Sequence, residues 1–148
     1  MVLRYSKETM ERFMNPKFVG EMKDADGFGE EGNFKCGDVM NVYIKVEDNI
    51  ITDMKFLTYG CVSAIASTDM VCEVAKGMTI DEAEKLNPKK VIDALVDVPP
   101  VKNHCSIMGI LALRRAIQDY KKKHNIDVPQ EDIDKLNAES EKNEEHHD

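Results

Sequence analysis

The chain has 148 residues and a formal net charge of −8, from 20 basic and 28 acidic side chains. This length suits one domain with a substantial core. A mean hydropathy of −0.44 and the lack of a long apolar run argue against a membrane span. The net acidity disfavours nucleic-acid phosphates as partners. Four cysteines are too few for a disulfide scaffold, and residues 1–7 lack the apolar run of a secretory signal, so we expect a cytoplasmic domain with reduced thiols.

The N-terminal part of the chain is predicted to contain one helix and one loop. Residues 6–13 have the pattern of a short amphipathic helix that Ser6 caps, and it ends before Pro16 because a residue preceding proline avoids helical backbone. Residues 20–32 combine glycines and acidic residues without periodicity, which indicates a flexible loop.

Two strands are predicted to follow as a hairpin. Residues 40–47 alternate between apolar and polar side chains, and residues 50–58 form a second extended run. Asp48 and Asn49 between the two runs are typical of a tight turn. The first strand can extend back through Val39 toward Cys36.

Helical patterns dominate after residue 60. Residues 63–76 are rich in Ala, Met and Val and end at Gly77, a typical residue just past a helix C-terminus. Thr79 and Glu82 match the capping box that starts a helix, here a short one ending near Leu86.

Three further segments complete the predicted domain. Residues 87–95 open with an Asn-Pro pair that suits a helix start, whereas two prolines keep residues 98–101 extended. Apolar residues then recur at helical spacing to about residue 123, at Ile107, Ile110, Leu113, Ile117 and Tyr120. The predicted fold class is α+β, a small antiparallel sheet of about three strands covered on one face by helices, with a long C-terminal helix.

The acidic charge is concentrated beyond this domain. Residues 127–148 contain nine acidic and two basic residues, a charge of −7, which leaves 18 basic and 19 acidic residues in residues 1–126. We therefore predict a domain over residues 1–126 and an acidic C-terminal tail over residues 127–148, solvated or weakly helical around Ile133 and Leu136.

The cysteines are the residues with the most evident chemistry, and no two of them have the Cys-x-x-Cys spacing of zinc ribbons and redox motifs. Cys36 lies at the start of the predicted sheet, and an extended chain would put Asp38 on its side of the strand, about 6.6 Å away. Cys61 and Cys105 come at predicted helix starts, where free amides and the helix dipole favour thiolate. Three thiols at element ends suit a soft-metal or iron–sulfur site, whereas Cys72, mid-helix, is expected in the core.

His104 precedes Cys105 and leaves three interpretations open. It is a fourth ligand, an acceptor for the thiol proton, or a histidine that only stands at a helix start.

Four strings of residues resemble those of the IscU/NifU-type iron–sulfur cluster assembly scaffolds. They are found at residues 15–20, 36–40, 58–67 and 99–106, and they include Cys36-Gly37-Asp38, Tyr59-Gly60-Cys61 and His104-Cys105. Their order and spacing are similar to those of the family, and the resemblance spans residues 3–124. The 44-residue step from Cys61 to Cys105 and the retained Pro-Pro-Val-Lys string are similar to the IscU branch rather than the SufU branch.

The resemblance implies a scaffold, with no turnover of its own, on which iron and desulfurase-derived sulfur form a [2Fe–2S] cluster for transfer to apo-proteins. It implies ligands at Cys36, Cys61 and Cys105, and Asp38 and His104 as candidates for the fourth position. The implied partners are a cysteine desulfurase, acceptor apo-proteins, ferredoxin, a frataxin-like protein, and a DnaK-type chaperone that recognises Pro99-Pro100-Val101-Lys102. It implies neither a nucleic-acid nor a membrane partner.

Two other functions use the same residues. One is a zinc-containing, SufU-like sulfurtransferase in which a cysteine accepts persulfide sulfur, and the other is a binding module with structural zinc. A carboxylate and a histidine beside three thiolates favour a labile cluster over a closed zinc site, and zinc in the resting form stays an open alternative. A flexible loop over residues 20–32 would let Cys36 move between sulfur donor and cluster.

Overall fold

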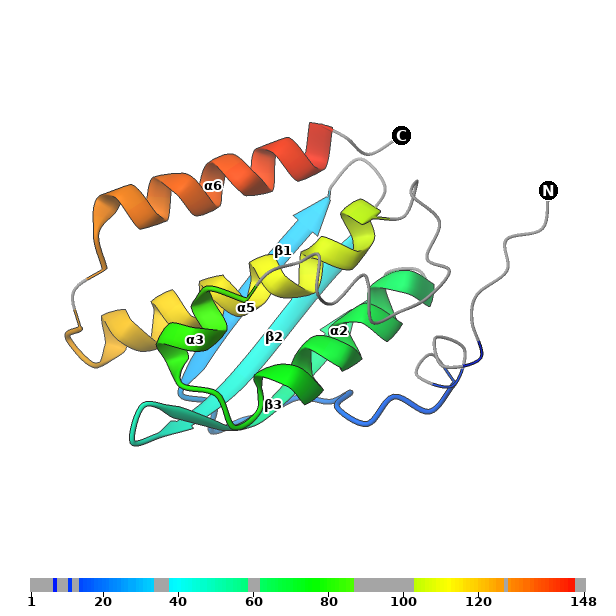
Figure 1. The fold of residues 1–148 in the computed structure, drawn as a ribbon, viewed down its shortest axis with the longest axis horizontal. Helices are drawn as coiled ribbons and strands as arrows, with labels where there is room; N and C mark the ends of the chain where they lie inside the picture. The colour runs from blue at the N-terminus through cyan, green and yellow to red at the C-terminus, as the bar shows by residue number, and fades with distance from the viewer. Residues whose placement is uncertain are drawn as a thin grey trace.

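Three antiparallel strands form one sheet in the order β1–β2–β3: β1 spans Gly27–Asn33, β2 Asp38–Glu47 and β3 Ile50–Thr58. They belong to a computed structural model, shown in Figure 1, which describes residues 7, 11, 14–33, 38–58, 62–86, 103–126 and 128–145. The hairpin of β2 and β3 is confirmed, and β2 begins two residues earlier than the alternation at 40–47 indicates. Asp48 and Asn49 both have positive φ, 52° and 63°, as the tight turn between twisted strands requires.

The prediction of a flexible loop over residues 20–32 is wrong for its second half, which forms β1. The strand lacks the usual alternation of apolar and polar side chains because glycines occupy two of its inward positions. Gly27 and Gly29 are buried, whereas Phe28 and Glu30 face outward. Glycine is needed there because the backbone of a helix lies against the strand. Residues 20–32 therefore do not form one flexible loop that would let Cys36 move between sulfur donor and cluster.

The helices follow the sheet in sequence. They are α2 at Val62–Ala75, α3 at Ile80–Glu84, α5 at Asn103–Lys123 and α6 at Gln130–Glu145. Gly77, just past α2, has φ of +94°, which glycine adopts without strain. The capping box is confirmed, since the Thr79 hydroxyl accepts from the Glu82 amide at 3.1 Å and the Glu82 carboxylate accepts from the Thr79 amide.

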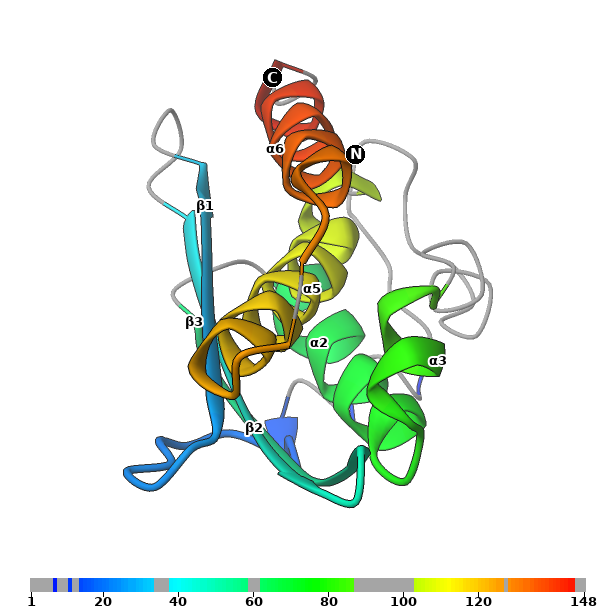
Figure 2. The same ribbon diagram turned by 90° about the vertical axis from the view of Figure 1, so that its left-hand side faces the viewer.

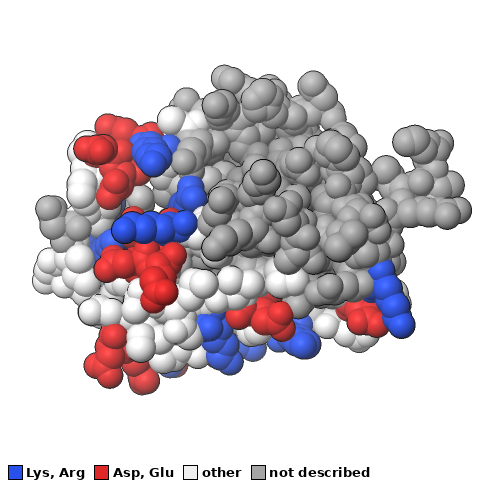
Figure 3. All heavy atoms as spheres, viewed as in Figure 1, with Lys and Arg blue, Asp and Glu red and all other residues white. Residues whose placement is uncertain are grey.

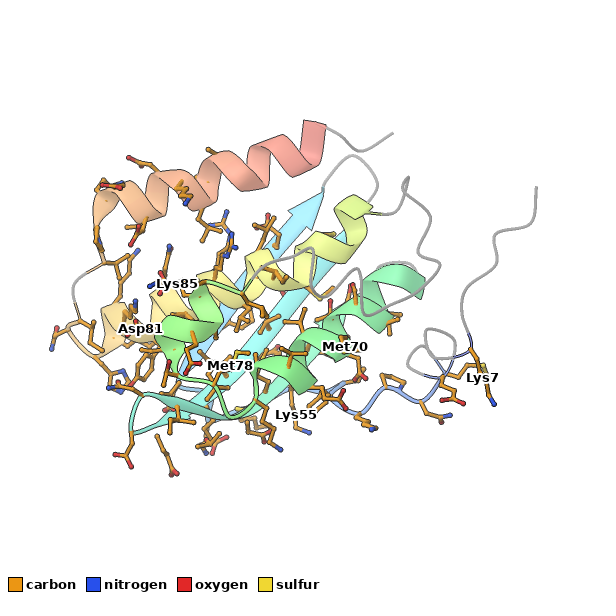
Figure 4. The ribbon with its side chains drawn as sticks, viewed as in Figure 1. Lys7, Lys55, Met70, Met78, Asp81 and Lys85 are labelled. Carbon is orange, nitrogen blue, oxygen red and sulfur yellow. The ribbon has the colours of Figure 1, made fainter. Side chains whose placement is uncertain are left out.

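All described helices lie on one side of the sheet, as Figure 2 shows edge-on. The inward side chains of β2 and β3 pack against α2 and α5, and Met40, Val42, Ile44, Met54 and Phe56 are fully buried. Met70 of α2 and Met78 before α3, both labelled in Figure 4, contribute to the core between helices and sheet. The predicted α+β class with helices on one face is confirmed.

The acidic segment contains a longer helix than its sequence indicates. Helix α6 runs beside α5 (Figure 1), and Leu136 is only 3% exposed. The Arg115 guanidinium donates to the Asn137 side-chain oxygen at 3.2 Å, which ties the two helices together. A single buried leucine in a highly charged helix gives a weak periodic signal, although Leu136 was one of the two residues around which helix was expected.

A short segment before the sheet is fastened to both β3 and α2. The amide of Phe56 donates to the Phe18 carbonyl at 2.9 Å, and the amide of Gly20 donates to the Phe56 carbonyl at 3.0 Å. The Asp69 carboxylate, fully buried on α2, accepts from the amides of Lys17 and Phe18 at 2.8 and 3.0 Å. One carboxylate therefore holds the segment across the edge of the sheet.

Replacing Asp69 with alanine is expected to lower the free energy of unfolding by about 2 kcal/mol, because the variant loses two charge-assisted hydrogen bonds. Exchange of the Lys17 and Phe18 amides with solvent deuterium should accelerate. The control is Asp69→Asn, which keeps an acceptor oxygen and should protect both amides better than alanine does. Equal protection in the wild-type and alanine proteins would show that Asp69 does not hold this segment.

The helix expected over residues 6–13 lies outside the described residues except for Lys7 and Glu11, both with helical backbone. The helix expected over residues 87–95 and the extended segment over 98–101 lie entirely outside them.

Candidate functional site

One end of the sheet collects three chain positions that the sequence associates with a site. Asn33, the last residue of β1, pairs with Asp38, the first residue of β2. Met40 pairs with Thr58, the last residue of β3, and the Thr58 hydroxyl donates to the Val39 carbonyl at 2.7 Å. The start of β2 and the end of β3 are therefore neighbours.

Helix α5 is directed toward this same end. A Cβ atom built on Gly27 would approach the carbonyl of Ala116, whereas one built on Gly29 would approach the carbonyl of Ala112. A step of two residues toward the end of β1 therefore matches a step of four residues toward the start of α5. Each step covers about 6 Å. The same progression brings the first turn of α5, with His104 and Cys105, toward Asn33 and Asp38.

Helix α2 runs beside α5 in the same direction, with both helices starting at this end of the molecule (Figure 1). The two helices are in close contact where Gly109 meets Thr68: a Cβ atom on Gly109 would lie 2.5 Å from the Thr68 hydroxyl oxygen. Gly109 is one turn beyond Cys105, and Thr68 is six residues beyond Val62, so this crossing fixes the two helix starts relative to each other. The first amides of each helix have no acceptor within the helix itself, and they lie at the sheet end.

The five predicted ligands are described to different extents. Asp38 opens β2, and His104 and Cys105 lie in the first turn of α5, each with a described backbone only. Cys36 and Cys61 lie outside the described residues. Among the side chains that the structure describes, no group of three or more could hold a metal ion. The side chains of the five predicted ligands are not among those described.

Cys72 lies in the core, as predicted. It is fully buried, and burial raises the pKa of its thiol well above the usual range, with smaller contributions in the same direction from Asp69 and Asp53. A neutral, enclosed thiol of this kind is a poor nucleophile and a poor ligand.

We expect the folded protein at pH 8 to leave Cys72 unmodified by iodoacetamide for as long as the native state persists, as read by mass spectrometry. The raised pKa also has a consequence for stability. As the pH rises, the Cys72 thiol loses its proton in the unfolded chain before it does so in the folded protein. The free energy of unfolding is therefore unaffected by this group below about pH 8.5 and decreases as the pH rises further. Rapid native-state alkylation of Cys72 would contradict its burial.

The described part of the molecule also contains a cavity of about 130 Å³ that is separate from this end. It lies between α3, α5 and α6, and its lining residues are Glu84, Arg114, Gln118, Asp132, Lys135 and Leu136. Arg114 is nine residues beyond Cys105, about 13 Å along the helix. On the face in Figure 3, basic and acidic side chains are interspersed and form no single-sign patch among the described residues.

Sequence reasoning missed the residues that bring the helices to the sheet end. Gly27 and Gly29 let the backbone of α5 lie against β1, and Gly109 leaves room for the Thr68 side chain of α2. The Gly-x-Gly spacing of Gly27 and Gly29 is visible in the sequence but does not by itself indicate a strand. Among the described helices, none is both long and apolar enough to cross a bilayer.

Comparison with known proteins gives consistent matches. Residues 4–127 match the NifU-like N terminal domain family. The chain is 51% identical over 120 residues to the iron–sulfur cluster assembly scaffold protein IscU 1 of Archaeoglobus fulgidus, covering 81% of this chain and 78% of that protein. It is 44% identical over 125 residues to IscU of Escherichia coli K12, covering 82% of this chain and 97% of that protein.

Solved structures share the fold. A protein from Fervidobacterium islandicum, described as a scaffold candidate for the SUF system, superposes with a TM-score of 0.64 at 26% identity, covering 76% of this chain and 96% of that one. The N-terminal NifU-like protein of Brucella abortus gives 0.64 at 19% identity over 80% and 94% of the two chains, a likeness of fold alone. The chain belongs to the NifU-like N-terminal domain family of IscU iron–sulfur cluster assembly scaffold proteins.

Proposed function

We propose that this protein is a scaffold on which a [2Fe–2S] cluster is assembled from iron and sulfur and from which it passes to apo-proteins. The observation that carries the proposal is the convergence of the β2 start, the α2 start and the first turn of α5 at one end of the molecule. The identity to proteins named as IscU scaffolds supports the same assignment. The cluster is the cargo of the protein and leaves it intact.

The proposed ligands are Cys36, Cys61 and Cys105, with Asp38 or His104 at the remaining position. In the chain, Cys36 stands two residues before the start of β2 and Cys61 directly before the start of α2, whereas Cys105 is within α5. Helix N-termini stabilise thiolates through free amides and the helix dipole. The arrangement therefore suits the binding of a cluster by three thiolates from separate elements.

A scaffold has to release what it binds, and the ligand set suits this requirement. Iron in such clusters prefers soft sulfur ligands, so a carboxylate or an imidazole makes one corner weaker than the other three. An incoming thiolate from an acceptor protein starts ligand exchange at that corner. The protein then acts as a carrier without turnover of its own.

The variant Asp38→Ala is expected to hold its cluster longer, because the hard oxygen ligand at the labile corner is removed and His104 is left to complete it. We expect the half-life of the visible absorption in the presence of a chelator to increase about threefold or more. Faster loss would mean that Asp38 mainly holds the cluster or caps the local fold.

Cluster transfer tests the proposed function. The loaded protein is mixed with an apo-ferredoxin under anaerobic conditions, and holo-ferredoxin is separated and quantified. Stoichiometric transfer that depends on loading supports the scaffold. A protein that instead keeps only zinc and carries a persulfide on one cysteine after incubation with a desulfurase would be the SufU-like sulfurtransferase.

The chemistry defines the proposed partners. A cysteine desulfurase supplies sulfur as persulfide, and reduction to sulfide needs an electron donor such as ferredoxin. Acceptor apo-proteins receive the cluster, and a frataxin-like protein and a DnaK-type chaperone at Pro99-Pro100-Val101-Lys102 stay proposals on family grounds. We infer a cytoplasmic setting, because the proposed thiolate ligands have to stay reduced.

A further inference from the structure

The cavity between α3, α5 and α6 is lined by three helices and has a volume of about 130 Å³. This volume equals that of about four water molecules in the liquid, so the space admits a molecule of roughly six bonded non-hydrogen atoms. One lining side chain is apolar and the other five are polar or charged: Leu136, and Glu84, Arg114, Gln118, Asp132 and Lys135. The cavity is therefore suited to a small polar molecule.

The side-chain amide of Gln118 is a polar group of this cavity without a hydrogen-bond partner. Gln118 is only 9% exposed, and no hydrogen bond joins its side chain to another residue in the part of the chain that the structure describes. Buried amides are nearly always hydrogen-bonded, because an unmet donor or acceptor costs stability. A side-chain amide is both a donor and an acceptor. A polar molecule in the cavity would complete these hydrogen bonds.

The charged groups of the lining differ in whether they already have a partner. The Glu84 carboxylate accepts from the Lys121 ammonium group at 2.7 Å. Asp132 and Lys135, both on α6, form no ion pair with each other or with another described residue. A molecule that neutralises both of them has to carry one negative and one positive group.

The register of α5 and α6 separates the acidic and basic ends of the cavity. The two helices run in opposite directions (Figure 1), and the Arg115 guanidinium donates to the Asn137 side-chain oxygen at 3.2 Å. Asp132 stands five residues before Asn137, about 7.5 Å along α6, and this step leads toward the C-terminal end of α5. Arg114 stays at the level of Asn137. The cavity therefore has a basic end at Arg114 and an acidic end at Asp132.

We propose that this cavity binds a small α-amino acid in its zwitterionic form. The carboxylate lies between Arg114 and Lys135, and the ammonium group donates to Asp132. The Gln118 amide completes the hydrogen bonds, and the short side chain of the ligand lies against Leu136. A carboxylate has two oxygens and serves both cations, whereas one ammonium group serves one carboxylate, so this class of molecule matches the charges of the lining. The inference does not depend on the proposed cluster ligands, which lie at another end of the molecule.

The test uses the isotopically labelled full chain without iron or zinc, so that its outcome is separate from that of the scaffold assignment. The probe is L-alanine, and its matched controls are propionate and ethylamine, each of which lacks one of the two charged groups. NMR shifts should change at Gln118, Asp132 and Lys135 with a dissociation constant on the order of a few millimolar. Each control should bind at least about tenfold more weakly. Equal binding of propionate or ethylamine, shifts confined to other residues, or no shift would overturn the proposal.

Variants test the individual contacts. Asp132→Asn should raise the dissociation constant of L-alanine about tenfold, because the ammonium group loses its carboxylate. The control Glu131→Gln removes an exposed charge from the neighbouring position of α6, outside the lining, and should change the constant less than about twofold.

Gln118→Leu should weaken the binding of L-alanine about fivefold and also raise the melting temperature of the free protein, because the unmet amide is gone. The two readouts separate a ligand contact from a structural role, since a residue with only a structural role would lower the melting temperature and leave binding unchanged. Unchanged binding in either Asp132→Asn or Gln118→Leu would contradict the proposal.

Discussion

Gly29→Ala is expected to lower the free energy of unfolding by at least about 3 kcal/mol, the high end for overpacking. The added Cβ atom would lie 2.1 Å from the Ala112 carbonyl oxygen and 2.5 Å from the Ala116 amide nitrogen, both backbone atoms of α5. Neither atom can rotate away, so the strand or the helix must shift. Alanine loses less chain entropy on folding than glycine does, but this stabilising effect is only about 0.5–1 kcal/mol.

Thermal and urea unfolding of Gly29→Ala measure this loss, and a melting temperature lower by roughly 9 °C corresponds to it. The matched control is Glu30→Ala, which places alanine at the next position of β1, where the side chain faces outward. The control should stay within about 1 kcal/mol of the wild type. If both variants melt together, α5 does not lie against β1 as closely as the structure has it, and the convergence at the sheet end loses its support.

The second large effect concerns the proposed ligands. Each of Cys36→Ser, Cys61→Ser and Cys105→Ser is expected to reduce the cluster retained after gel filtration by about tenfold or more, because a hydroxyl is a hard and weakly acidic replacement for a thiolate. Visible absorption with iron and sulfide analysis measures the retained cluster. The unloaded variants should keep the far-ultraviolet circular dichroism of the wild type.

Cys72→Ala provides the matched control within the same chain. It removes a thiol from the core and is expected to cost about 1 kcal/mol of stability, yet it should retain as much cluster as the wild type. If Cys72→Ala loses the cluster as fully as the other three, Cys72 is not merely a core residue. If one of the other three retains it, that cysteine is not a ligand.

The hairpin and the capped helices were predictable because local chemistry determines them. Asp48 and Asn49 take the positive φ values of a tight turn, and Thr79 with Glu82 forms the capping box that their spacing indicates. The long C-terminal helix follows from apolar residues on one face, of which Leu113 and Ile117 are fully buried. In these segments, the residues that determine the local structure are close to one another in the sequence.

Strand β1 was not predictable, because its pattern depends on an element about 85 residues away. Gly27 and Gly29 face inward where apolar side chains would mark a strand, and the reason is the backbone of α5. The inward Glu31 similarly pairs with Arg115, whose guanidinium lies 3.1 Å from its carboxylate. A single sequence carries no sign of such pairings.

The candidate site is predictable in the identity of its residues rather than in its assembly. Cysteines at element ends point to a shared centre, and the resemblance to the IscU family orders them. The approach of the β2 start, the α2 start and the first turn of α5 depends on the glycine contacts of α5 with β1 and on the crossing of Gly109 with Thr68, which are tertiary features. The assignment of ligands is for this reason a proposal that chemistry has to test.

Anaerobic reconstitution of the full chain with ferrous iron, sulfide and thiol tests the scaffold assignment most directly. After removal of unbound iron, we expect a coloured protein with the visible absorption of a [2Fe–2S] cluster and equal amounts of iron and sulfide. We also expect loss of that colour as an apo-ferredoxin gains it. A colourless chain that holds only zinc after the same treatment would show that the protein is not a cluster scaffold.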